Sequence, residues 1–133
     1  MVKEIVEEHN LAFEPWEDVE EKTESRDMRL ERFNIPYVPD VVKEGAEVLF
    51  YPGCQAEERA QEVREAAKVI LDFFNVDFTL LEEFSCCSLP SQLMGDAKTA
   101  EALAKKLKKK VKKLGVKRVV TTCAGCTLSL IHI

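Results

Sequence analysis

The chain has 133 residues, which is enough for one domain with an additional segment but not for two full domains. Charged residues make up 32% and hydrophobic residues 46% of the chain, a composition typical of a globular protein and not of a disordered one. The net charge of −5 argues against nonspecific nucleic-acid binding, and the apolar runs are too short for membrane insertion or a signal peptide.

Charge divides the sequence at about residue 44. Residues 1–44 contain 13 acidic and 6 basic residues (net −7), whereas residues 45–133 contain 11 acidic and 13 basic residues (net +2). Pro15, Pro36 and Pro39 would interrupt any long helix in the first part. We therefore predict an acidic leader, mainly helical or irregular, over residues 1–44 and a compact domain from residue 45 onward.

Strand-like and helix-like patterns alternate from residue 45. Residues 46–51 are an apolar run closed by Pro-Gly and predict a buried strand. Residues 55–74 show apolar side chains at helical spacing, and residues 77–81 predict a second strand. The apolar stripe expected on the first helix comprises Ala60, Val63, Ala67, Ile70, Leu71 and Phe74.

A second helix and a third strand follow. Residues 91–114 predict a helix that ends at Gly115, where a helix C-cap glycine belongs, and residues 116–122 are rich in β-branched residues, as strands are. The seven lysines between positions 105 and 113 surround an apolar stripe, which indicates a solvated helix face. The inner positions of this helix are Leu103, Leu107, Val111 and Leu114.

This order of elements predicts an α/β fold with a small three-stranded parallel sheet and crossover helices. The helix that would follow the third strand is expected to be missing, so the domain is expected to be truncated. Residues 128–133 do not resemble an amphipathic helix and match the translated end of a common sequencing adapter. We predict that they are a non-native scar and that the domain occupies residues 45–127.

All five cysteines follow predicted strands. Cys54 comes just after the first strand, Cys86 and Cys87 a few residues after the second, and Cys123 and Cys126 just after the third. In a parallel sheet these carboxyl ends meet at one edge, where open α/β sheets place their ligands. The sequence therefore predicts that five thiols gather at one edge of the sheet.

The five cysteine thiols limit the kinds of site that the chain could form. An odd number of cysteines without an export signal argues against a disulfide framework and for a cytoplasmic protein. Coordination by sulfur alone is typical of zinc or an iron–sulfur cluster. A zinc ion takes four ligands in a tetrahedron, and this chain offers five thiols, two of them adjacent, which favours a cluster. A metal-free dithiol oxidoreductase using Cys123 and Cys126 is a third alternative, although no adjoining basic side chain would lower a thiol pKa.

The pattern C-x31-C-C-x35-C-x2-C resembles the cysteine-rich CCG domain of heterodisulfide reductase catalytic subunits. Similar domains occur in glycolate oxidase iron–sulfur subunits, lactate-utilisation proteins and anaerobic glycerol-3-phosphate dehydrogenase subunits. The resemblance covers residues 46–126. Its motifs are YPGC at 51–54, the Cys-Cys pair followed by Pro90 and Gly95-Asp96, and CAGC at 123–126.

The resemblance implies an oxidoreductase subunit that carries electrons to a disulfide or reduces it. In this family five cysteines bind a [4Fe-4S] cluster, which is non-cubane in some members, so Cys54, Cys86, Cys87, Cys123 and Cys126 would be the ligands. The implied partners are ferredoxin-like or flavin-containing subunits of a redox complex, which could attach the protein to a membrane complex. No catalytic residue is implied.

Two departures and two alternatives accompany the resemblance. Ser88 follows the cysteine pair where the family name specifies glycine, and a side chain there restricts the backbone. The chain carries one copy of the motif where family subunits usually carry two, so we expect it to be inactive alone. The alternatives are an electron-relay subunit of a flavin-dependent 2-hydroxy-acid or glycerol-3-phosphate dehydrogenase, and a structural zinc module.

Overall fold

A computed structural model describes residues 31–133 of the chain. Most of the predicted acidic leader, residues 1–30, lies outside these residues. Residues 31–33 are helical, and residues 35–43 have no regular secondary structure. The elements that follow are β1 (Val48–Tyr51), α4 (Cys54–Glu58), α5 (Gln61–Phe73), β2 (Phe78–Thr79), α6 (Leu89–Leu93), α7 (Ala97–Leu114), β3 (Arg118–Thr121) and α8 (Ala124–His132).

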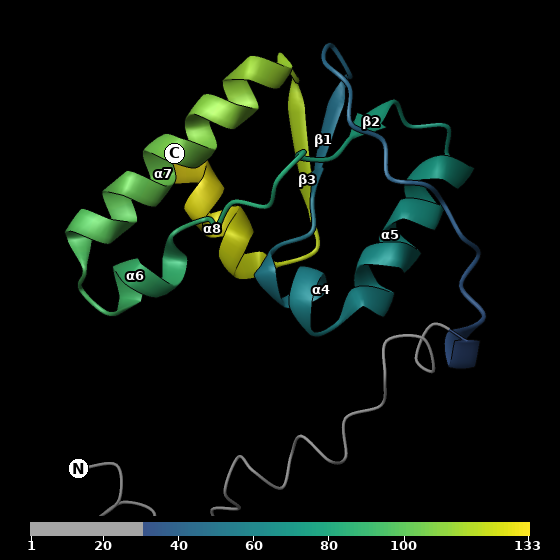
Figure 1. Ribbon diagram of the computed structural model, residues 1–133, viewed down its shortest axis with the longest axis horizontal. Helices are drawn as coiled ribbons and strands as arrows, with labels where there is room; N and C mark the ends of the chain where they lie inside the picture. The colour runs from purple at the N-terminus through teal and green to yellow at the C-terminus, as the bar shows by residue number, and fades with distance from the viewer. Residues whose placement is uncertain (1–30) are drawn as a thin grey trace, which may run out of the picture.

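The three strands form one parallel sheet with β1 in the centre, in the order β2-β1-β3. Leu49 of β1 is in register with Thr79 of β2 and with Val119 of β3. The predicted α/β fold with a small three-stranded parallel sheet is therefore confirmed. All three strands end at the same edge, where α4 and α8 begin (Figure 1).

Helices cover both faces of the sheet (Figure 1). Val48 and Phe50 face α5 and pack with its Leu71, whereas Leu49 and Tyr51 face the opposite side and pack with residues of α7 and α8. Every residue of β1 is buried as a result, which explains its unbroken apolar sequence. The core on the α7 side consists of Leu49, Tyr51, Cys87, Leu107, Leu114 and Cys126.

Both predicted helices are divided in the structure. The predicted helix over 55–74 is α4 and α5, which are separated at Arg59 and Ala60. The predicted helix over 91–114 is α6 and α7, and Gly95 between them has a φ of +77°. No described helix is long and apolar enough to cross a membrane.

The expectation that no helix follows the third strand is wrong, because α8 runs from Ala124 to His132. Cys126 and Ser129 lie on its buried side, and Leu130 packs against the core. Because the buried position 129 holds a small polar residue, the sequence of α8 lacks the apolar periodicity of an amphipathic helix. The non-native origin of residues 128–133 stays a prediction.

The apolar stripe predicted for the first helix is only partly buried. Leu71 is buried, but Val63 and Ile70 are 43% and 57% exposed. The helix covers the sheet on the side of β1 and β2, so these two side chains line an open groove with Phe33 and other residues. The buried positions of α5 are Glu65, Lys68 and Leu71.

A buried ion-pair network replaces apolar packing along this part of α5. The Lys68 side chain is 1% exposed, and its Nζ atom lies 2.7 Å from carboxylate oxygens of both Asp40 and Glu65. Arg64 pairs with the same Asp40 and, at 3.2 Å, with Glu57 of α4. The network therefore ties the segment before β1 to α5 and to the helix that begins at Cys54.

Truncating a core leucine of α7 tests the packing of this layer. Leu107 is 0% exposed, so Leu107→Ala is expected to lower the free energy of unfolding by about 2–5 kcal/mol through lost burial and a residual cavity. Leu93→Ala makes the same change at a position that is 79% exposed and should stay within about 0.5 kcal/mol of the wild type. Urea unfolding measures both, and equal losses would contradict the assignment of this core.

The decrease in the free energy of unfolding at acid pH tests the ion-pair network. Burial opposes ionisation of Asp40, but hydrogen bonds from Arg64 and Lys68 outweigh it and hold the pKa of that carboxyl below its usual range. Such a group stabilises the fold above its unfolded pKa of about 4, and this contribution is lost as the pH falls through the folded pKa. Asp40→Asn should therefore be less stable than the wild type near neutral pH and lose less stability on acidification.

Urea unfolding of both proteins between about pH 7 and pH 2 measures this difference. Glu58→Gln, which changes an exposed carboxylate on α4, serves as the control. Parallel stability curves for the wild type and Asp40→Asn would contradict the role given to Asp40.

Candidate functional site

The five cysteines lie on the three segments that leave the carboxyl edge of the sheet. Cys54 is the first residue of α4 and is separated from the end of β1 by Pro52 and Gly53. Cys86 and Cys87 lie in the irregular segment between β2 and α6. Cys123 is the N-cap residue of α8, and Cys126 lies in the first turn of that helix. The predicted placement of the thiols at one sheet edge agrees with this topology.

Gly53 allows the first and third of these segments to come together. Its φ of +85° lies in the region that favours glycine. A Cβ atom at this position would lie 3.0 Å from the Sγ atom of Cys126 and 3.3 Å from the Cβ atom of Cys123. The missing side chain therefore leaves the space in which the Cys54 segment meets the start of α8.

The thiols affect one another's ionisation. Burial, followed by the neighbouring Cys86 and Cys87, raises the pKa of Cys54. Burial also raises the pKa of Cys126, and hydrogen bonds with Cys87 and Cys123 add to this effect. Burial and the neighbouring thiols thus oppose ionisation of both Cys54 and Cys126.

Cys123 is the exception in this group. The backbone N–H of Cys126 donates to its sulfur and lowers the pKa of Cys123, and the N–H of Gly125 contributes in the same direction. The position at the N-terminus of α8 explains the effect, because free N–H groups point outward there. No basic side chain adjoins this cysteine in the sequence, and backbone N–H groups lower its pKa instead.

Tyr51 connects the central strand to the cysteine pair. Its side chain is 1% exposed, and its hydroxyl donates to the carbonyl of Ser85 at 2.6 Å. Its ring stacks on Phe84 with the centroids 5.8 Å apart. Burial raises the pKa of Tyr51, and the nearby cysteines, Cys87 first, add to this effect.

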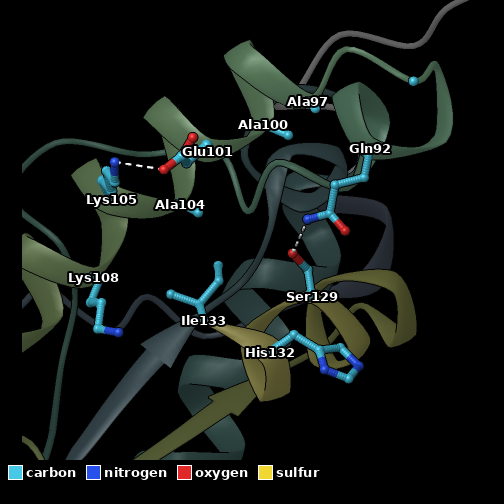
Figure 2. Close-up of a pocket in the computed structure, with 11 residues that line it drawn as sticks. Gln92, Ala97, Ala100, Glu101, Ala104, Lys105, Lys108, Ser129, His132 and Ile133 are labelled. Carbon is cyan, nitrogen blue, oxygen red and sulfur yellow. Dashed lines mark hydrogen bonds and ion pairs between the residues drawn. The ribbon is translucent and has the colours of Figure 1, made fainter.

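Polar side chains hold the turn after the cysteine pair. Ser88 is fully buried and has a φ of +72°. Glycine adopts this left-handed conformation most easily, which gives a conformational reason for a glycine after the cysteine pair. The Gln92 amide donates to the Ser88 hydroxyl at 2.8 Å. The Ser129 hydroxyl donates to the carbonyl of Cys87. Figure 2 shows Gln92 of α6 and Ser129 of α8 pointing toward each other, with a hydrogen bond of 3.3 Å between them.

Sequence reasoning identified the cysteines but missed these supporting residues. Tyr51 belongs to the YPGC motif, so its position beside Cys54 was a usable signal. Ser129 gave no signal, because its partners Gln92 and Cys87 are 37 and 42 residues away, whereas Gln92 has a local partner in Ser88, four residues before it. Within residues 31–133, no three His, Cys, Asp or Glu side chains are arranged to hold a single metal ion.

Comparison with known proteins agrees with the cysteine pattern. Residues 48–131 match the family model of the CCG cysteine-rich domain. An uncharacterised iron–sulfur protein of Methanococcus maripaludis is 33% identical over 101 residues, which cover 76% of this chain and 20% of the relative. An uncharacterised iron–sulfur protein of Methanocaldococcus jannaschii is 35% identical over 83 residues, which cover 62% and 17%.

The chain thus spans about a fifth or less of the length of these relatives. No solved structure matches it significantly. The matched region begins at the first residue of β1 and ends within α8, so it includes all five cysteines.

Two substitutions at Ser88 test the backbone of the cysteine-pair turn. Ser88→Gly and Ser88→Ala both remove the hydroxyl that accepts from Gln92, but glycine alone tolerates the positive φ. Ser88→Gly should therefore be more stable than Ser88→Ala by about 1 kcal/mol in urea unfolding.

The same pair of substitutions at Ser91 is the matched control. Ser91 lies inside α6, where alanine is favoured over glycine, so the order of stability should reverse. The same order at both positions would contradict a conformational requirement at Ser88.

Proposed function

The chain belongs to the family of CCG cysteine-rich domains, and on this premise we propose that it binds an iron–sulfur cluster and carries electrons in an oxidoreductase of the heterodisulfide-reductase type. The proposed ligands are Cys54, Cys86, Cys87, Cys123 and Cys126. The observation that carries the proposal is the placement of these five thiols on the three segments that leave one edge of the parallel sheet, all within the region that matches the family.

The chemistry of the donor set supports a cluster. The group consists of sulfur atoms alone, and thiolates select zinc or iron–sulfur centres. Five thiols on three segments exceed the four ligands of a zinc tetrahedron, whereas several iron atoms can share them. Gly53 lets the Cys54 segment approach Cys123 and Cys126, and the N–H groups at the start of α8 that lower the pKa of Cys123 favour an anionic group there. The two named relatives are iron–sulfur proteins, which agrees with this choice.

The burial of the ligands indicates how electrons would reach the site. Cys87 and Cys126 are 3% exposed and would anchor the group on the core side. Cys54, Cys86 and Cys123 are partly exposed, so a donor or substrate can approach the outer side. When bound, a [4Fe-4S] cluster accepts and donates single electrons.

The proposed substrate is a disulfide. Its S–S bond breaks when it gains two electrons and two protons, and two thiols form. The electrons would come from a ferredoxin-like or flavin-containing partner subunit, and the protons from solvent. A relay role in a flavin-dependent 2-hydroxy-acid or glycerol-3-phosphate dehydrogenase uses the same cysteines without the disulfide.

Anaerobic reconstitution of the 133-residue chain with ferrous iron and sulfide tests the proposed centre. We expect a brown protein that contains iron and acid-labile sulfide, with an electron paramagnetic resonance signal on reduction. Serine substitution of any of the five cysteines should lower the iron content, because each removes a thiolate ligand. Thr122→Ser, beside Cys123, keeps the hydroxyl that donates to the Pro52 carbonyl and serves as the matched control.

Cys87→Ser separates the cluster from a structural zinc site. Loss of Cys87 leaves four thiolates, enough for zinc but not for a five-ligand cluster. We expect the variant to bind less iron than the wild type. A colourless wild-type protein with stoichiometric zinc, retained in Cys87→Ser, would refute the iron–sulfur proposal.

A further inference from the structure

Ser85 carries a buried hydroxyl that the fold leaves unpaired. The residue is 4% exposed, and its Oγ atom has no hydrogen-bond partner among the residues that the structure describes. Its neighbours differ in this respect, because the hydroxyls of Ser88 and Ser129 both take part in hydrogen bonds. Buried hydroxyls in native proteins are nearly always paired, so an unpaired one calls for a partner that is not part of the protein.

The position of Ser85 is fixed next to the thiols. It directly precedes Cys86, and its carbonyl accepts the hydrogen bond from Tyr51. Tyr51 is the last residue of β1, and Cys54 follows it after Pro52 and Gly53. The backbone of Ser85, one position before Cys86, is therefore tied to the end of the central strand from which the Cys54 segment also leaves.

The cysteine-pair segment alternates in burial. Ser85 and Cys87 are buried, whereas Cys86 between them is partly exposed. Ser85 is thus buried like Cys87, which belongs to the same core cluster as Cys126. None of the described thiols accepts from the Ser85 hydroxyl, so an acceptor would have to come with the group that the cysteines bind.

We propose that Ser85 donates a hydrogen bond to a sulfur atom of the group that the five cysteines bind, and that this bond raises the reduction potential of that group. The inference rests on the proposed function. Hydrogen bonds to sulfur stabilise the more negatively charged, reduced state, because the donor offsets its additional charge. Ser85 is then a positioning and tuning residue and not a ligand.

The test compares Ser85→Ala with the wild type and with Ser85→Thr, which keeps the hydroxyl. Each 133-residue chain is reconstituted anaerobically with ferrous iron and sulfide, and the iron content and the reduction potential are measured. We expect equal iron content in all three proteins, a more negative potential for Ser85→Ala, and a potential close to the wild type for Ser85→Thr.

The metal-free proteins give a second readout. Removing an unpaired hydroxyl should leave the urea midpoint of Ser85→Ala unchanged or higher. Ser129→Ala removes a hydroxyl that donates to the Cys87 carbonyl and should lower the midpoint. A loss of stability in metal-free Ser85→Ala equal to that of Ser129→Ala would overturn the inference, because the hydroxyl would then have a protein partner.

The two proposals fail in different ways. If the wild type takes up no iron and sulfide, the proposed function is refuted and the role of Ser85 with it. If the wild type is reconstituted and Ser85→Ala has the same reduction potential, the role of Ser85 alone is refuted.

Discussion

The parallel pairing of β1 with both of its neighbours is the constraint on which the site depends. Because β2 and β3 run in the same direction as β1, the segments that leave all three strands start at one edge. Each of these segments carries at least one cysteine. The backbone hydrogen bonds of the sheet thus bring together thiols that lie up to 72 positions apart, from Cys54 to Cys126.

Because helices cover both faces of the sheet, the backbone at this edge is held in place. β1 is buried on both sides, by α5 on one face and by α7 and α8 on the other. Tyr51, the last residue of β1, connects the sheet to the cysteine-pair segment through its hydrogen bond to the Ser85 carbonyl. The hydrophobic core and the cysteine group therefore share residues, since Cys87 and Cys126 belong to the core cluster.

Polar contacts, and not apolar ones, determine the detail of the cysteine-pair segment. Ser88 adopts a positive φ, Gln92 pairs with its hydroxyl, and Ser129 reaches the Cys87 carbonyl from another helix. Such a network fixes a loop well only when each member is paired. The hydroxyl of Ser85 differs from these side chains, because it has no hydrogen-bond partner among the residues that the structure describes.

The amino-acid sequence by itself determined the order of strands and helices, the parallel sheet, the solvated lysine face of α7 and the cysteines as a group. These follow from local periodicity and from spacing, which a single chain displays directly. The division of the helices at Arg59 and Gly95, the exposure of Val63 and Ile70, and the existence of α8 did not follow, because they depend on which parts of the sheet each helix covers.

Only the tertiary structure decided which side chains support the cysteines. Buried Lys68 and Glu65 in α5 and buried Ser129 in α8 occupy positions where periodicity predicts solvent or apolar residues. Lys68 and Glu65 pair with each other, but Lys68 also pairs with Asp40 before β1, and Ser129 pairs with Cys87 and Gln92, so no local pattern reveals these longer-range contacts. The physical reason is that a buried polar group is stabilised by hydrogen bonds formed across the fold, whereas sequence periodicity reports only whether a side chain avoids water.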